Sequence, residues 1–197
     1  ILPGTFLRGE TKIGSDCVIG PSADLLDTVV DDGTLVEHSV GRGAAIGAGV
    51  SVGPYAYLRP GTVLGEASKV GAYCELKNTK VGAESKVPHL SYVGDTEIGE
   101  GANLGAGTIT ANYDGKNKHR TRIGDGVFTG INTNLIAPIS VGESAYIGAG
   151  SVVNKDVPPG KLAVGMPARV IRDAPGQVSE DGEKSQDERQ RPYKTEG

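Results

Sequence analysis

The fold is decided by the run "IGAGVSVGPYAYLRPGTVLGEASKVGAYCEL" (46–76), in which an aliphatic residue returns at every sixth position. Neither the period of an α-helix nor that of a plain β-strand produces this spacing, whereas short strands joined by sharp corners do. Three such sides close a coil of about 18 residues, and coils of this kind stack into a parallel β-helix. The run therefore predicts an all-β solenoid built from hexapeptide repeats.

The same spacing continues in both directions, with occasional five-residue steps and with Thr at two positions. The predicted anchors are Ile13, Ile19, Leu25, Val40, Ile46, Val52, Leu58, Leu64, Val70, Leu76, Val81, Val87, Val93, Ile98, Leu104, Thr110, Ile123, Thr129, Leu135, Val141, Ile147 and Val153. Small residues four positions after an anchor predict a second inward-facing position. These are Ala23, Ala44, Ala56, Ser68, Ala102, Ala145 and Ser151. Three anchors per coil give about seven coils, stacked about 4.8 Å apart.

The composition fits a core made of small side chains. The 197 residues include 31 Gly and 2 Phe but no Trp, so aromatic rings cannot fill the interior. Cys17 and Cys74 stand four positions after an anchor, which predicts core thiols rather than a disulfide or a zinc site. The glycine-rich stretches "GRGAAIG" (41–47) and "GEGANLG" (99–105) are products of the repeat, because neither opens an amphipathic helix.

The charges exclude several classes of partner. The formal net charge is -4, and acids and bases are nearly balanced outside the C-terminal segment, so we expect no nucleic acid. No apolar run of about 18 residues and no basic leader is present, which predicts a cytoplasmic protein without membrane insertion. The chain starts at Ile1 inside patterned sequence, which indicates a fragment. We expect a solenoid over 1–165, a C-terminal extension over 166–173 and a charged, disordered tail over 174–197.

Two cations interrupt the regular pattern on one side of the predicted coil. Leu58 and Leu76 anchor the same side one coil apart, and Arg59 and Lys77 follow them directly. Stacked cations repel each other unless an anion lies between them, and a phosphate group suits both side chains. The alternative is a pair of solvated surface cations that lean apart.

A polar insertion leaves the coil in the same column. The hexads stop at "ANYDGKNKHRTR" (111–122) and resume at Ile123. Protruding segments of a rigid scaffold are a frequent place for function. The insertion contains the polar residues Lys116, Lys118, His119 and Arg120. A plain mobile surface loop is the alternative.

The stretch "KVPHLSYVGD" (86–95) combines polar and aromatic residues close to these cations. The repeat places Tyr92 at the corner beside the cations and His89 shortly before it. His38 lies in an irregular stretch and is predicted to be solvated or structural, and the charged neighbours of His119 make it a poor base. His89 is therefore the best candidate for a general base, since imidazole ionises near neutrality.

Four motifs resemble one bacterial enzyme family. They are "LRPG" (58–61), "HLSYVGD" (89–95), "NLGAGTITANYDGKNK" (103–118) and "IGAG" (147–150). They resemble the acetyltransferase half of the bifunctional glucosamine-1-phosphate N-acetyltransferase and N-acetylglucosamine-1-phosphate uridyltransferase family, over about residues 3 to 165. The family's uridyltransferase half, for which Mg²⁺ is expected, is absent here.

This resemblance implies a left-handed parallel β-helix and a homotrimer with sites between subunits. It implies direct acetyl transfer, without a metal, from acetyl-CoA to the amino group of glucosamine 1-phosphate, for UDP-N-acetylglucosamine and cell-wall synthesis. His89 is then the general base. The sugar phosphate is held by Arg59, Lys77, Tyr92, Asn103 and Lys118. Acetyl-CoA is bound by Ala106, Asn112, Tyr113 and Ala149.

The resemblance is incomplete around the outer part of the CoA site. Ile131 stands where the family has Ser, and Met166 stands where Arg is usual. The ending "VGMPARVIRD" (164–173) is similar to that of simpler hexapeptide acyltransferases. Arg169 and Arg172 then either meet CoA phosphates or remain solvated.

Other functions on this scaffold are weighed against this one. Another O- or N-acetyltransferase acting on a sugar or small molecule is the nearest alternative. A β-helical zinc carbonic anhydrase is disfavoured, because two of its three histidine ligands lie close in sequence and the histidines here do not. A non-catalytic binding solenoid would carry regular rows of Thr on one face, and only scattered Thr are present.

Overall fold

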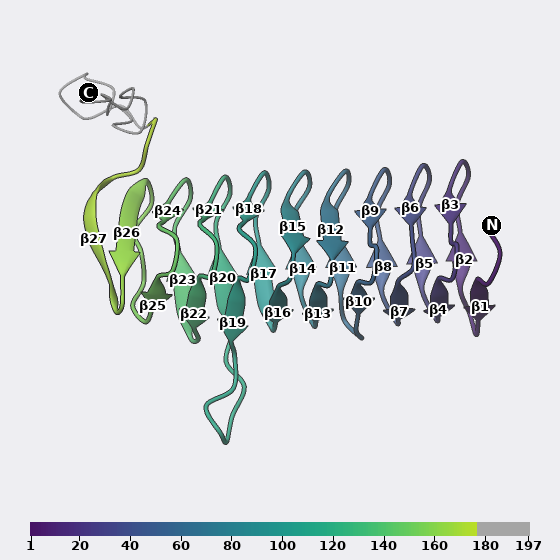
Figure 1. Ribbon diagram of the computed structural model, residues 1–197, viewed down its shortest axis with the longest axis horizontal. Helices are drawn as coiled ribbons and strands as arrows, with labels where there is room; N and C mark the ends of the chain where they lie inside the picture. The colour runs from purple at the N-terminus through teal and green to yellow at the C-terminus, as the bar shows by residue number, and fades with distance from the viewer. Residues whose placement is uncertain (177–197) are drawn as a thin grey trace, which may run out of the picture.

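The computed structural model describes residues 1–176 as a column of stacked coils with three sheets running along it (Figure 1). The first sheet contains β1 (Phe6–Arg8), β4 (Asp24–Leu26), β7 (Val40–Arg42), β10 (Tyr57–Leu58), β13 (Glu75–Lys77), β16 (Tyr92–Gly94), β19 (Ile109–Ala111), β22 (Asn134–Ile136) and β25 (Val152–Val153). The second sheet contains β2 (Lys12–Ile13), β5 (Val29–Val30), β8 (Ala45–Ile46), β11 (Val63–Leu64), β14 (Lys80–Val81), β17 (Thr96–Ile98), β20 (Thr121–Ile123) and β23 (Ile139–Val141). The third sheet contains β3 (Val18–Ile19), β6 (Leu35–Val36), β9 (Ser51–Val52), β12 (Lys69–Ala72), β15 (Lys86–His89), β18 (Asn103–Leu104), β21 (Phe128–Thr129), β24 (Tyr146–Ile147), β26 (Lys161–Gly165) and β27 (Ala168–Asp173).

Consecutive strands alternate among the three sheets, which confirms the predicted parallel β-helix. Stacked strands pair in parallel, as Leu58 does with Leu76 in the first sheet and Leu64 with Val81 in the second. The hand of the coil stays a prediction of the family resemblance. Over residues 1–176 the structure contains no helix that is able to cross a membrane.

The number of coils differs from the prediction. The first sheet has nine strands, one per coil, rather than the seven coils expected. The repeat count missed the buried Val30 and Val36, and it placed an anchor at Val40, which is half-buried. Gly41 occupies the inward position instead, in register with Leu25 and Leu58.

A glycine anchor hides the repeat from sequence inspection because it has no side chain. A Cβ at Gly41 would lie 2.8 Å from Leu25 Cδ2, which is too close for any larger residue. Leu25 fills the space that the missing side chain leaves. The anchors also follow each other after five residues rather than six at two places, from Leu25 to Val30 and from Val36 to Gly41. Each short step shifts the six-residue pattern by one position.

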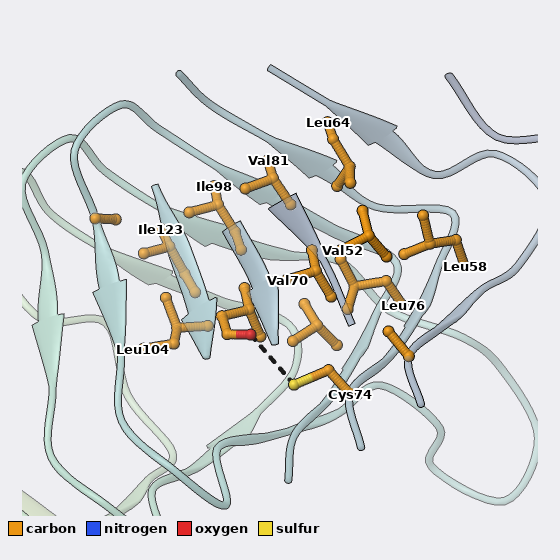
Figure 2. Packing of buried hydrophobic residues seen from close by; sticks show 14 of the residues in the cluster. Val52, Leu58, Leu64, Val70, Cys74, Leu76, Val81, Ile98, Leu104 and Ile123 are labelled. Carbon is orange, nitrogen blue, oxygen red and sulfur yellow. Dashed lines mark hydrogen bonds between the residues drawn. The ribbon is translucent and has the colours of Figure 1, made fainter. Parts of the chain in front are cut away.

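The core consists of the predicted anchors and the small residues that follow them. Figure 2 shows side chains from all three sheets meeting in one interior, among them Val52, Leu58 and Leu64. Each buried Val, Leu or Ile side chain contributes about 1.5–3 kcal/mol to folding. The seven predicted small positions are all buried.

The two cysteines differ in burial. Cys74 is buried, its Sγ lies 3.2 Å from the carbonyl oxygen of Val87 (Figure 2), and burial raises the pKa of the thiol. Cys17 is only partly buried at the edge of the core, and its Sγ lies 3.1 Å from the carbonyl oxygen of Asp31. The prediction of a core thiol is confirmed for Cys74 and holds only in part for Cys17.

Two of the three corner columns matter for the site. We call the corner between the first and second sheets the loop edge, which contains Arg59, Lys77, Asp95 and the loop 112–120. We call the corner between the third and first sheets the histidine edge, which contains Tyr55, Tyr73, His89, Leu90, Ala106, Ile131 and Ala149. The two edges border the first sheet on either side.

The predicted insertion projects from the column between β19 and β20 (Figure 1). Its arms are joined by an antiparallel bridge between Tyr113 and Lys118. The Asp114 carboxylate accepts hydrogen bonds from the N–H groups of Lys116 and Asn117 and lies 2.7 Å from His119 Nε2. The Asn117 N–H, His119 and the Lys116 N–H lower the pKa of Asp114 to about 2. The loop is therefore internally hydrogen-bonded rather than a plain excursion.

The last coil is closed by the antiparallel pair of β26 and β27, which contains the ion pair of Lys161 with Asp173. Ala174, predicted to begin the disordered tail, is buried, and its N–H donates to the Gly160 carbonyl. The ordered chain therefore extends past the predicted boundary, because this residue packs on the final coil. The rest of the predicted tail, from residue 177, lies outside the described residues.

Candidate active site

Two predicted phosphate ligands lie on neighbouring coils of the loop edge. Arg59 follows β10 and Lys77 ends β13, and these strands pair directly. Arg59 Nη1 lies 2.8 Å from Glu75 Oε1, and this hydrogen bond raises the pKa of Arg59 above its ordinary value. One carboxylate is thus bound to the first cation.

A third cation reaches this edge from the loop. Lys118 is exposed on the second arm, and its ammonium group lies beside that of Lys77. Hydrogen bonding with Lys77 and the charge of Lys77 lower the pKa of Lys118. The charge of Arg59 acts in the same direction, and that of Asp95 opposes it. Two lysines from distant parts of the sequence therefore share one small region.

Asp95 lies beneath these lysines and was assigned no role from the sequence. Its side chain is only 10% exposed, and Lys77 Nζ lies 3.7 Å from Oδ2. Asn78 Nδ2 donates to Oδ1 at 2.7 Å, and Asn112 Nδ2 donates to Oδ2 at 2.5 Å. Burial by itself raises the pKa of Asp95, but these hydrogen bonds and the charges of Lys77 and Lys118 outweigh it and lower the pKa.

Tyr92 lies on the outer side of the first sheet and extends towards the loop edge. It is half-buried and pairs in register with Glu75. A Cβ at Gly94 would lie 2.5 Å from the Tyr92 hydroxyl and 2.6 Å from Asn112 Nδ2. Only glycine at this position leaves room for the ring and the amide. The Asn112 side chain, predicted to bind acetyl-CoA, is therefore packed against Tyr92 and Asp95.

The histidine edge holds the second group of predicted residues. His89 is exposed at the end of β15, and its carbonyl accepts hydrogen bonds from Ser91 Oγ at 2.7 Å and from the Gly107 N–H at 3.2 Å. On the coils that follow, the Ala106 carbonyl accepts from the Asn132 N–H at 2.7 Å. The exposed Ala149 lies further along this edge.

A cavity of about 430 Å³ opens where this edge meets the C-terminal end of the third sheet. It is lined by Gly130, Tyr146, Gly148, Ala149, Leu162, Val164, Arg172 and Pro175. Tyr146 stacks on Phe128, with ring centroids 4.6 Å apart. Of the two arginines near the chain end, Arg172 lines this cavity. Arg169 donates to the Ala168 carbonyl and lines a separate hollow.

The remaining predicted residues lie around these groups. Asn103 is on the third sheet, in register with Phe128. Tyr113 is exposed on the loop, where its hydroxyl donates to the Gly115 carbonyl at 2.7 Å. Ile131 and Met166 are exposed, at 55% and 75%, so both departures from the family pattern are on the surface.

The structure thus brings the predicted residues into two groups rather than one. Arg59, Lys77, Tyr92, Asn112 and Lys118 gather at the loop edge. His89, Ala106 and Ala149 follow the histidine edge. The strands of the first sheet, such as the three-residue β16, lie between the two edges. Residues 1–176 contain no cluster of three His, Cys, Asp or Glu side chains suited to a metal ion.

The coils match a known class of transferase. Residues 43–78 and 120–155 match the family described as bacterial transferase hexapeptide (six repeats). Together with the parallel β-helix, this confirms the resemblance read from the sequence. The chain belongs to the hexapeptide-repeat acyltransferases.

Within this class, the curated relatives are bifunctional GlmU proteins. GlmU of Rubrobacter xylanophilus is 76% identical over 184 residues, which cover 93% of this chain and 39% of the relative. GlmU of Brevibacillus brevis is 54% identical over 164 residues, which cover 83% of this chain and 36% of the relative. The chain therefore spans less than half the length of these relatives.

Solved structures share the architecture. UDP-N-acetylglucosamine acyltransferase from Campylobacter jejuni superposes with a TM-score of 0.62 over 86% of this chain and 73% of its own, at 17% identity. A mutant of perosamine N-acetyltransferase from Caulobacter crescentus, solved in complex with CoA and GDP-perosamine, gives a TM-score of 0.52 at 25% identity, over 58% of this chain and 52% of its own. The first comparison bears on the fold alone.

Proposed function

We propose that the chain transfers the acetyl group of acetyl-CoA to the amino group of glucosamine 1-phosphate. The product, N-acetylglucosamine 1-phosphate, is a precursor for UDP-N-acetylglucosamine and cell-wall synthesis. The observation that carries this proposal is the loop edge, where, among the described residues, Arg59, Lys77 and Lys118 meet only the carboxylates of Glu75 and Asp95. One positive charge remains in excess, and a phosphate monoester supplies the missing negative charge.

His89 acts as general base in this proposal. The amine of the sugar is largely protonated near neutrality, and it must lose a proton before it attacks the thioester carbon. An imidazole next to the amine accepts that proton and can return it to the departing thiolate. The new N–C bond forms as the C–S bond breaks, and CoA leaves as the free thiol. No acyl-enzyme is needed, and burial together with a raised pKa makes Cys74 unreactive.

Acetyl-CoA would lie along the histidine edge towards the C-terminal cavity. The backbone of Ala106 and Ala149 would receive its pantetheine arm, and Ala149 also lines the cavity. Arg172 would meet a phosphate group there, taking the part of the Arg that the family has at the position of Met166. Bound acetyl-CoA supplies the activated acyl group, and we propose no metal for this step because a free amine attacks thioesters directly.

The proposal includes a homotrimer. The histidine edge exposes a row of large side chains, with Tyr55 55%, Tyr73 61% and Leu90 63% exposed. Tyr55 and Tyr73 stack with ring centroids 5.3 Å apart, and Leu90 directly follows His89. Such a row is typical of a surface that packs against a partner. Sedimentation velocity is expected to give a trimer, and a monomer at micromolar concentration would contradict this part of the proposal.

Substrate profiling tests the reaction. We expect acetylation of glucosamine 1-phosphate with release of free thiol, and much slower acetylation of glucosamine, serine or maltose. The nearest alternative is another sugar or small-molecule acetyltransferase on this scaffold. Faster acetylation of an acceptor without a phosphate would exclude glucosamine 1-phosphate in favour of that alternative.

A further inference from the structure

The carboxylate of Asp95 connects the solenoid to the start of the loop by hydrogen bonds. It lies next to the cations of the loop edge, Lys77 and Lys118. Its contacts come from Lys77 and Asn78 on one coil and from Asn112 at the start of the loop. Its backbone makes the same connections: the Asp95 N–H donates to the Lys77 carbonyl at 2.9 Å, and the Thr121 N–H donates to the Asp95 carbonyl at 3.2 Å. Thr121 follows the loop, so Asp95 binds both of its ends.

We propose that Asp95 is a positioning residue for the phosphate of the acceptor: its buried carboxylate fixes the loop through Asn112 so that Lys118 and Lys77 face one anion together. This rests on the proposed acetyl transfer to a sugar phosphate. Asp95 acts through the two lysines and does not itself touch the substrate.

The hydrogen bonds explain why the lysines remain available to an anion. Both carboxylate oxygens of Asp95 accept short hydrogen bonds from amide groups, at 2.7 Å and 2.5 Å, whereas Lys77 Nζ is at 3.7 Å. The charge of Asp95 thus stabilises the lysines without occupying their N–H donors. A phosphate oxygen is able to take those donors, since charge-assisted hydrogen bonds to phosphate are among the strongest in proteins.

The charges around this point also require a carboxylate. Lys118 interacts with Lys77, Asp95 and Arg59, and Arg59 in turn interacts with Glu75 and Tyr92. With Asp95 ionised, one positive charge is in excess. Without it, two are in excess and the two lysines repel each other with no anion beneath them. Lys118 then loses its proton more readily.

The test compares Asp95→Asn with Asp125→Asn in the full chain. Asp125 is also a corner carboxylate, and it accepts a hydrogen bond from the Glu100 N–H at 2.8 Å, at the corner between the second and third sheets. Asp95→Asn is expected to raise KM for glucosamine 1-phosphate about tenfold or more, with KM for acetyl-CoA unchanged and kcat within about threefold. Asp125→Asn is expected to change none of these constants. Equal increases in both KM values, or no increase, would overturn the proposal.

A second readout does not depend on the identity of the acceptor. NMR titration of isotope-labelled lysine side chains is expected to show that Lys118 loses its proton at lower pH in Asp95→Asn than in the wild type. The high-pH limb of kcat/KM for the sugar phosphate is expected to move in the same direction. An unshifted Lys118 titration contradicts the role of Asp95, whereas a wild-type enzyme inactive on glucosamine 1-phosphate contradicts the proposed function instead.

A milder variant serves if Asp95→Asn does not fold. Asn78→Ala removes only the hydrogen bond to Oδ1, and Asn78 is exposed. It is expected to raise KM for the sugar phosphate about threefold, through looser placement of the carboxylate. An unchanged KM in this variant would count against the proposal.

Discussion

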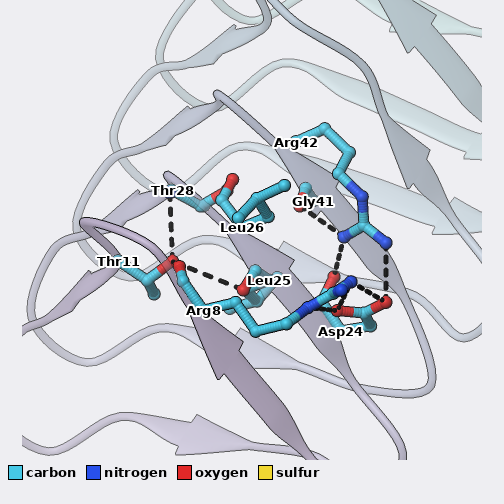
Figure 3. A network of polar contacts seen from close by, with 8 residues as sticks. All are labelled: Arg8, Thr11, Asp24, Leu25, Leu26, Thr28, Gly41 and Arg42. Atoms are coloured by element: carbon cyan, nitrogen blue, oxygen red, sulfur yellow. Dashed lines mark hydrogen bonds and ion pairs between the residues drawn. The ribbon is translucent and has the colours of Figure 1, made fainter.

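Two charged clusters along the first sheet differ in how their cations are bound. Near the N-terminus, Arg8 and Arg42 both bind the carboxylate of Asp24 (Figure 3), at 2.7 Å and 2.6 Å. In the middle of the column, Lys77 is 3.7 Å from Asp95, whose oxygens are hydrogen-bonded to amides. The first cluster leaves few donors free, whereas the second leaves ammonium donors free.

The side chains account for this difference. A guanidinium group binds a carboxylate through two parallel hydrogen bonds, and Arg42 also donates to the carbonyls of Asp24 and Gly41 (Figure 3). An ammonium group is a point charge with three donors, which remain free when the nearest carboxylate is bound elsewhere. Both clusters have one positive charge in excess, but only the second keeps free N–H donors for an anion. We expect the Asp24 cluster to serve stability and the Asp95 cluster to serve binding.

The largest expected effect comes from His89, which lies on the histidine edge, across the first sheet from the second cluster. His89→Ala is expected to lower kcat about 100-fold or more with little change in either KM, because general base catalysis is lost while binding remains. Steady-state kinetics on glucosamine 1-phosphate measure this. His38→Ala is the control, since His38 packs against Tyr55 at the same edge with centroids 5.5 Å apart and is expected to keep kcat. Near-normal turnover of His89→Ala would remove it as the base.

The next largest effect is expected when a cation is removed from each cluster and the two variants are compared. Lys77→Ala is expected to raise KM for glucosamine 1-phosphate about tenfold or more, because a charge-assisted hydrogen bond to the phosphate is lost. KM for acetyl-CoA is expected to stay the same. Arg42→Ala removes a cation from the first cluster and is expected to alter neither constant. Similar kinetic changes in both variants would mean that the clusters do not differ in function.

The thermal stability of Arg42→Ala tests whether the first cluster stabilises the fold. Losing the hydrogen bonds to Asp24 and two carbonyls is expected to cost about 1 kcal/mol, or about 2–4 °C in Tm for a chain of this size. Differential scanning calorimetry measures this shift. Arg122→Ala is the matched control, because Arg122 is 68% exposed and 3.9 Å from Glu97. A Tm for Arg42→Ala equal to that of the control would show that the Asp24 cluster does not stabilise the fold.

The smallest expected effect is the acid sensitivity of the first cluster. The hydrogen bond from Arg42 lowers the pKa of Asp24, and Arg8 lowers it further. Together they outweigh burial, which raises the pKa. A carboxyl group with a lowered folded-state pKa stabilises the fold above its unfolded value of 3.8 and loses this contribution as the pH falls through the folded value. The difference in Tm between wild type and Asp24→Asn is therefore expected to shrink below about pH 4. A constant difference between about pH 7 and about pH 2 would contradict this assignment.

The sequence predicted the architecture because the repeat is a local pattern. Anchors six residues apart and small residues four positions later are fixed by corner geometry that each coil repeats. The same regularity made the departures visible, so Arg59, Lys77 and His89 were chosen as site candidates from the sequence, and their roles stay predictions. The place of the loop was predicted in the same way, and the structure confirms it. Around Gly41 the anchor was assigned to the neighbouring Val40, and the count of coils was too low because it missed anchors such as Val30 and Val36.

The sequence by itself determined the parallel β-helix, the inward positions and the place where the loop leaves the column, since each of these depends on neighbours within one or two coils. Only the tertiary structure decided that Lys118 lies against Lys77, that Asn112 is bound to Asp95 and that Ala174 packs on the last coil. These contacts depend on how the loop and the chain end fold back on the column. Side-chain packing and hydrogen bonding fix the positions of the loop and the chain end on the column, and the hexapeptide repeat does not encode these contacts.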